Sequence, residues 1–132
     1  NRLTFSPLAD ELDFTKNYIF LQKIRFGDNL QIAVKGENVN RFVPPLAIQL
    51  LVENAIKHNV VSELHPLNVN LNIEDNYCTI TNSIKEKLDK DSTGIGLNNL
   101  QARYLYLSNE PVEVKNSNGI FSVRLPLLKL EG

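Results

Sequence analysis

Segments with the apolar period of an α-helix alternate along this chain with segments that have the period of a β-strand. The first helical pattern runs through residues 8–25 and is ended by the polar, glycine-containing residues 26–29. Ser6 is expected to cap this helix, and Pro7 to occupy its first position, where a missing N–H costs nothing. The chain therefore opens with a helix of about five turns.

A strand and a second helix follow. Residues 30–35 alternate apolar and polar side chains, which predicts a strand with one buried face. The residue before Pro44 is forced into extended backbone, and Pro45 is expected to open a helix that runs to about Asn59. The remaining elements are a strand pair at 67–73 and 77–81, a mobile loop at 83–93, a helix after the glycines at 94 and 96, and a hairpin of 112–115 with 120–125.

This order of elements predicts the fold class. Helices placed at intervals among hairpins indicate a two-layer α/β (α+β) sandwich, in which a mixed sheet carries its helices on one face. A doubly wound dinucleotide fold is excluded, because its glycines follow a strand directly. Here Gly94 and Gly96 follow a polar loop instead.

Composition excludes several classes of function. The formal net charge of −1 argues against nucleic acid or an anionic membrane as the main partner. No apolar run approaches the roughly 20 residues that a membrane span requires. The single cysteine, Cys78, lies in a predicted strand, cannot form a disulfide within the chain and fits a reducing compartment. The first residue is Asn1 and methionine is absent, so we expect a piece of a longer protein.

The second helix has a polar edge. On a helix, Glu53, Asn54, Lys57 and His58 fall on the side away from the apolar residues, which are Ile48, Leu51, Val52, Ala55 and Ile56. An amide oxygen beside a carboxylate, an ammonium and an imidazole suits a phosphate bound through Mg²⁺. The alternative is a solvated helix face with one Glu–Lys pair.

A glycine-rich turn is the second signal. The string TGIGL at residues 93–97 leads from a polar loop into a helix. Glycines let backbone N–H groups approach a ligand, and a helix start offers unpaired donors, so this turn suits a phosphate. The alternative is a tight turn with no ligand.

Together the two signals resemble a known family. The strings VPPL at 43–46, LVENAIKH at 51–58 and TGIGLNNL at 93–100 are similar, in order and spacing, to the ATP-binding domain of LytS-type sensor histidine kinases. These kinases belong to the GHKL superfamily of gyrase, heat-shock chaperone, histidine kinase and MutL ATPases. The resemblance covers about residues 8–127 and implies a Bergerat-type ATP-binding fold. It also implies two parts, an N-terminal helix at 1–27 leading from a dimerisation segment and the catalytic domain at 28–132.

The resemblance implies roles for the residues that match its motifs. Asn54 would hold Mg²⁺ against the triphosphate, and Glu53 would order water or accept a proton. Residues 83–93 would form a lid over ATP. The nucleotide would contact Asn54, Lys57, His58, Asn82, Ile84, Thr93, Gly94, Ile95, Gly96 and Leu97.

One departure from the family pattern concerns the adenine contact. Relatives have Asp-Asn-Gly where this chain has Asn82-Ser83-Ile84. Asn82 still offers an oxygen acceptor, without the charge that roughly doubles the strength of such a bond. Two alternatives to a working kinase domain therefore stay open: a degenerate interaction domain, and an ATPase of another branch of the superfamily. Against the second alternative, this chain has Leu50 at the position where ATPases of that branch have a water-activating Glu.

The implied activity is that of a protein-histidine kinase in a two-component system. Its cofactors would be ATP and Mg²⁺, and its partners the kinase's own dimerisation and histidine segment and a response regulator. Neither His58 nor His65 matches the phospho-acceptor motif, so the fragment alone is expected to be inactive. The parent is expected to be a homodimeric inner-membrane protein, with this domain in the cytoplasm and without direct membrane contact.

Overall fold

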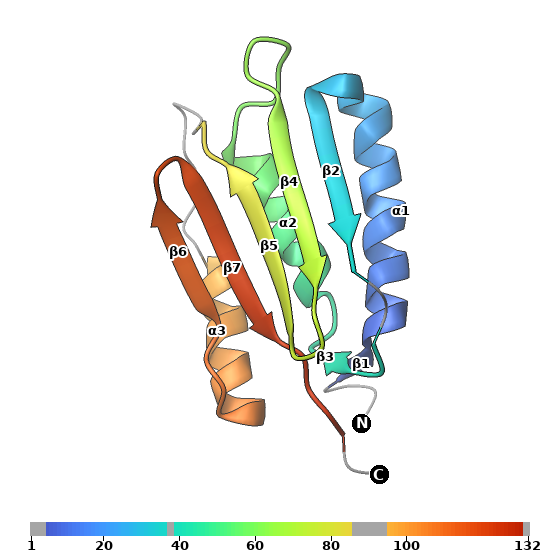
Figure 1. Ribbon diagram of the computed structural model, residues 1–132, viewed down its shortest axis with the longest axis vertical. Helices are drawn as coiled ribbons and strands as arrows, with labels where there is room; N and C mark the ends of the chain where they lie inside the picture. Colours follow the sequence, from blue (N-terminus) through green and yellow to red (C-terminus); the bar gives the residue numbers. More distant parts are fainter. Residues whose placement is uncertain (1–4, 37–38, 86–94, 131–132) are drawn as a thin grey trace.

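Five strands form one mixed β-sheet, and three helices cover one of its faces (Figure 1). The computed structural model describes residues 5–36, 39–85 and 95–130. The sheet order is β2-β4-β5-β7-β6, and a separate pair joins β1 to β3. The bounds are β1 Ser6–Pro7, α1 Leu8–Phe26, β2 Leu30–Lys35, β3 Phe42–Val43, α2 Ala47–His58, β4 Leu67–Ile73, β5 Tyr77–Ser83, α3 Ile95–Ser108, β6 Glu113–Ser117 and β7 Ile120–Pro126.

The two predicted hairpins form the antiparallel part of the sheet. β5 pairs with β4 on one side and with β7 on the other, and β6 pairs with β7 at the edge. β2 runs parallel to β4, with Leu30 opposite Leu67. A parallel neighbour requires a crossover, and the chain between β2 and β4 supplies it through β3 and α2. The topology therefore holds α2 against the sheet.

The two faces of the sheet differ in polarity. On β4, the apolar residues at 67, 69, 71 and 73 are buried under the helices, while Asn68, Asn70 and Asn72 point to the open face. β5 continues the pattern, with Cys78 and Ile80 inside. This alternation confirms the predicted two-layer α/β sandwich with a mixed sheet.

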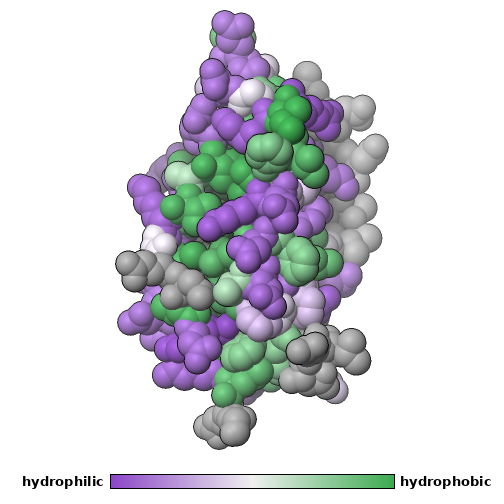
Figure 2. Space-filling model, turned by 90° about the vertical axis from the view of Figure 1, so that its right-hand side faces the viewer, coloured by the Kyte–Doolittle hydropathy of each residue, from purple (hydrophilic) through white to green (hydrophobic). Residues whose placement is uncertain are grey.

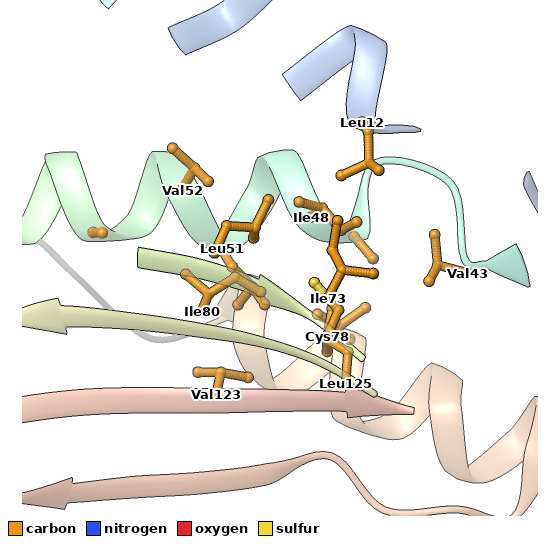
Figure 3. Close-up of a cluster of buried hydrophobic side chains, with 14 of the residues drawn as sticks. Leu12, Val43, Ile48, Leu51, Val52, Ile73, Cys78, Ile80, Val123 and Leu125 are labelled. Carbon is orange, nitrogen blue, oxygen red and sulfur yellow. The ribbon is translucent and has the colours of Figure 1, made fainter. Parts of the chain in front are cut away.

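The core lies between α2 and the sheet. Figure 3 shows Ile48 and Leu51 of α2 facing Ile73 and Ile80 on the strands. The five predicted apolar residues of α2 are all buried. Cys78 is buried among them, and burial raises the pKa of its thiol to about 12. The thiol is therefore protonated and serves as a small core residue.

The helices are joined to each other and to the strands. α1 contacts α2 and β2, and α2 also contacts α3. The hydroxyl of Tyr104, on α3, donates a hydrogen bond of 2.9 Å to the carbonyl of Pro126 at the end of β7. None of the helices in the described ranges is long and apolar enough to cross a membrane.

The expected start of the first helix is wrong by one residue. α1 begins at Leu8, and Pro7 is its N-cap, without a side-chain cap from Ser6. Ser6 and Pro7 instead form β1, with Ser6 opposite Val43. The N–H of Leu8 donates to the carbonyl of Arg41 at 2.9 Å, so a distant segment satisfies the donor that a cap would have taken.

Among the other boundaries that differ from expectation, two concern the candidate site residues. α2 begins at Ala47 and not at Pro45, because Leu46 adopts left-handed backbone with φ of 65° and acts as the N-cap. β5 runs two residues beyond residue 81, because Asn82 pairs in register with both Val69 and Phe121. Asn82 therefore lies within a strand and not after it.

Candidate functional site

The polar edge predicted on α2 is present. Glu53, Asn54 and His58 are half-buried, and Lys57 is exposed. The opposite side of the helix is fixed in the core by Ile48 and four further apolar residues, which sets the roll of the helix. The buried side therefore determines which way Asn54 and its neighbours point.

Glu53 is held by its own helix. Nε2 of Gln49, one turn earlier, donates to Oε1 of Glu53 at 2.9 Å. Among the described residues, Glu53 forms no ion pair with Lys57, the pair on which the solvated-face alternative relied. The carboxylate is thus oriented by a neutral amide, and the Lys57 ammonium stays exposed.

α1 adds a group that interacts with Glu53, Tyr18, which sequence reasoning missed. The pKa of Tyr18 is raised by partial burial and then by the Glu53 carboxylate, whereas Arg25 lowers it. Tyr18 therefore interacts electrostatically with the edge of α2 through Glu53, and Arg25 interacts with Tyr18 within α1. Tyr18 and Arg25 lie seven residues apart on α1. This spacing places both on one side of the helix, and it was visible in the sequence.

A buried carboxylate fixes the start of α2. Glu11, on α1, is only 3% exposed, and its Oε1 accepts a hydrogen bond from the backbone N–H of Leu46. Leu46 is the left-handed N-cap of α2, a conformation that costs a branched residue free energy. The negative charge also lies at the positive end of the helix. Glu11 therefore positions the helix that carries Asn54, although it is not near the polar edge itself.

A second amide fixes the other end of α2. Asn59 is buried at the C-cap, and its Nδ2 donates to the carbonyl of Ala55 at 2.9 Å. Its Oδ1 accepts from the N–H of Lys85 at 2.9 Å, and the Lys85 carbonyl accepts from Val60 at 2.8 Å. Asn59 thereby joins α2 to the chain after β5. Sequence reasoning took Asn59 only as the end of the helix.

Asn82 and Ile84 lie at this same end of β5. Asn82 is buried on the face of the sheet that the helices cover, and its Nδ2 donates to the carbonyl of Ser83 at 2.8 Å. Ile84 is half-buried, and its N–H donates to the carbonyl of Gly119 at 3.0 Å. Asn82 is thus turned inwards, with its amide nitrogen already engaged.

The start of α3 contacts α2 beside the polar edge. A Cβ added to Gly96 would lie 3.2 Å from Cδ1 of Leu50, a distance tighter than ordinary packing. Leu50 is one turn before Asn54, so the glycine turn and the polar edge meet in space. Leu97 is half-buried and packs against the core. The predicted contacts of Thr93 and Gly94, the side chain of Ile95 and most of the lid at 83–93 lie outside the described residues.

The metal chemistry of the site rests on few groups. Within the part of the chain that the structure describes, no group of three or more His, Cys, Asp or Glu residues could hold a metal ion. The amide of Asn54 and the carboxylate of Glu53 are adjacent and partly open to solvent. A hard cation that brings its own water and phosphate ligands needs only such a contact.

Comparisons with known proteins agree with this geometry. No protein-family model matches the chain. It is 42% identical over 57 residues to sensor protein LytS of Enterococcus faecalis, covering 42% of this chain and 10% of that protein. It is 33% identical over 116 residues to a sensor-like histidine kinase of Staphylococcus epidermidis, covering 73% of this chain and 22% of that protein. It is 30% identical over 115 residues to sensor histidine kinase BtsS of Escherichia coli, covering 75% of this chain and 19% of that protein. The chain thus spans about a tenth to a fifth of these relatives.

Solved structures show the same fold. The catalytic domain of histidine kinase ThkA superposes with a TM-score of 0.64 at 16% identity, covering 95% of this chain and 99% of that one. The cytoplasmic segment of histidine kinase QseC gives 0.61 at 18% identity, covering 97% and 78%. The predicted resemblance to the ATP-binding domain of LytS-type sensor histidine kinases is confirmed by these sequence and fold similarities.

The Glu11–Leu46 contact makes a prediction about stability. Glu11→Ala should lower the free energy of unfolding by about 2–4 kcal/mol, because it leaves the Leu46 N–H without its acceptor and removes buried packing. Glu11→Gln, which keeps a neutral acceptor, should cost about 1 kcal/mol. Urea unfolding measures both. Asp13→Ala, an exposed carboxylate on the same helix, is the control and should change stability by less than about 0.5 kcal/mol. Equal losses for Glu11→Ala and Asp13→Ala would refute the role of Glu11.

Proposed function

We propose that this chain is the catalytic, ATP-binding domain of a two-component sensor histidine kinase. It would bind Mg-ATP and position the γ-phosphate for transfer to a histidine outside the chain. The observation that carries this proposal is the contact of Gly96 with Leu50, which brings the start of α3 to the polar edge of α2. Phosphoryl transfer depends mostly on positioning and charge stabilisation, and these two helices offer both kinds of group.

The residues of α2 would hold the metal and the phosphates. Asn54 would give its amide oxygen to Mg²⁺, which supplies charge neutralisation to the phosphates when bound. Glu53, oriented by Gln49, would accept a hydrogen bond from a metal-bound water or take up a proton. Lys57 and His58 would extend towards the phosphates from the last turn of the helix.

The backbone at the start of α3 would bind phosphate oxygens. The first N–H groups of a helix have no partner within the helix and carry a positive partial charge, so they suit an anion. Thr93, Gly94, Ile95, Gly96 and Leu97 would provide these donors. The close approach of Gly96 to Leu50 supports this, because a side chain at position 96 would press on Leu50, which would then have to shift by a few tenths of an ångström.

Asn82 would contact the adenine through Oδ1. Its Nδ2 is engaged with the Ser83 carbonyl, so the oxygen is the atom left to accept a hydrogen bond from the adenine amino group. Ile84 would border the ring. The parts at 1–27 and 28–132, the response regulator, the homodimeric parent and its membrane anchorage remain proposals drawn from the resemblance.

One observation favours a second candidate, a degenerate interaction domain. Asn82 is buried and its Nδ2 is bonded to its own neighbouring carbonyl, so a nucleotide would have to reach a buried acceptor whose orientation is already fixed. The ATPase alternative has less support. Leu50, at the position of the expected water-activating Glu, packs against α3 and has no acid–base chemistry.

The role of Asn54 can be tested by calorimetry. Asn54→Ala should weaken Mg-ATP about tenfold to a hundredfold, as loss of a metal contact does, and should leave metal-free adenosine unchanged. Asn68→Ala, on the open face of the sheet, is the matched control and should change neither ligand. Equal weakening of both ligands by Asn54→Ala would contradict the metal role, and no binding by the wild-type chain would favour the interaction domain.

The role of Asn82 can be tested by nucleotide preference. Asn82→Asp should tighten ATP by about 1 kcal/mol, because a carboxylate is the stronger acceptor for the adenine amino group. GTP should not gain, since guanine presents a carbonyl at that place. The buried charge should also lower the stability of the free protein. If ATP and GTP tighten alike, or neither changes, Asn82 does not contact the adenine.

A further inference from the structure

The two halves of the candidate site come from segments that are separate in the sequence. Asn54 lies in the middle of α2, whereas Asn82 lies near the end of β5, with β4 between them along the chain. Figure 1 shows the C-terminal end of α2 and the end of β5 at the same end of the molecule. One ligand can contact both segments well only if their distance and relative orientation are fixed.

A single buried side chain connects the two segments. Asn59 is 5% exposed and is the C-cap of α2. Its Nδ2 donates to the carbonyl of Ala55 at 2.9 Å, and its Oδ1 accepts from the backbone N–H of Lys85 at 2.9 Å. The carbonyl of Lys85 accepts from the N–H of Val60 at 2.8 Å. Both backbone groups of Lys85, two residues beyond the end of β5, are therefore bonded to the end of α2.

The link requires a short side chain that donates and accepts at once. A carboxamide has both groups, whereas a carboxylate only accepts and would place a negative charge at the negative end of the helix. An apolar residue at position 59 would leave the N–H of Lys85 without its acceptor. Asn59 is buried with both ends of its amide engaged, so its chemistry suits a link between segments and not a direct contact with a ligand.

Each half of the site is also held by contacts that do not involve Asn59. The apolar side of α2 packs in the core, and Glu11 bonds the N-cap of the helix at the end away from Asn59. Glu11 belongs to α1, which lies along the side of the molecule that faces the viewer in Figure 2, where apolar and polar side chains are mixed. Asn82 is held by the pairing of β5 with both of its neighbouring strands. These contacts orient each half, and Asn59 joins the halves to each other.

We propose that Asn59 is a positioning residue, which fixes the polar edge of α2 relative to the end of β5 so that one nucleoside triphosphate binds to both. This role rests on the proposed function, because the two halves must bind parts of the same molecule. Two binding groups joined in one ligand gain affinity from each other only when their two sites are held at a matching distance. Without the link, each half keeps its own contacts, and the joined ligand loses part of that gain.

Asn59→Thr tests the link while preserving the end of the helix. A Thr hydroxyl can donate to the carbonyl four residues earlier, here that of Ala55, but it is too short to reach Lys85. Calorimetry should show Mg-ATP weakened about tenfold, as on loss of a residue that orients a ligand group. Adenosine and magnesium tripolyphosphate, which each match one half, should change by less than about twofold. Asn72→Thr, the same substitution on the open face of the sheet, is the matched control and should change none of the three ligands.

The outcomes distinguish the role of Asn59 from the proposed function. Equal weakening of all three ligands by Asn59→Thr would indicate a general loss of structure and would overturn the positioning role. Unchanged binding of Mg-ATP by this variant would overturn it as well. If the wild-type chain itself does not bind Mg-ATP, the proposed function is wrong, and the positioning role is wrong with it.

Hydrogen exchange, followed by amide NMR, measures the link without any nucleotide. Asn59→Thr should speed exchange of the Lys85 amide about tenfold, because its N–H loses its acceptor. The amide of Ile84, which donates to the carbonyl of Gly119, should keep its rate. Asn72→Thr should change neither rate. Equal acceleration at Ile84 and Lys85, or none at Lys85, would show that Asn59 does not hold the chain after β5 and would refute the proposal.

Discussion

The hydrogen bond from the Leu46 N–H to the buried Glu11 carboxylate decides how the rest of this domain is arranged. It joins α1 to the N-cap residue of the crossover helix, across 35 positions of sequence. The parallel pairing of β2 with β4 requires that crossover, and the left-handed backbone of Leu46 turns the chain into it. The carboxylate accepts the hydrogen bond of this donor and lies at the positive end of the helix dipole, so it fixes the residue at which α2 starts.

α2 serves the core and the candidate site at once. Its apolar side packs on the sheet, and that packing alone directs Asn54 and Glu53 towards the other side. Asn59 joins the last turn of α2 to the chain after β5, and Leu50 contacts Gly96 at the start of α3. Three segments far apart in sequence thus meet around one helix, which is the arrangement that binding of a phosphate-bearing ligand would need.

Periodicity predicted the elements, the buried side of α2 and the fold class, because these depend on local burial patterns. The boundaries near proline were wrong where a distant segment took over the local role, as Arg41 does for the donor at Leu8. Glu11, Tyr18 and Asn59 were missed because they have partners on other elements. Glu11 did leave a signal, a charged residue on a helix side that also carries Leu8 and Leu12. Asn82 is turned inwards because β5 extends two residues beyond its predicted end and pairs there with β7. No local sequence pattern indicated this extension.

The central claim is that the polar edge of α2 and the start of α3 form one binding site for Mg-ATP. Titration of isotope-labelled protein with Mg-ATP, followed by amide NMR, tests it most directly. The account predicts that the largest shifts fall on residues 53–58, 82–85 and 95–97, and that Mg²⁺ alone produces almost none of them. Shifts centred on the open face of the sheet, at Asn70, Thr79 or Thr81, would contradict it.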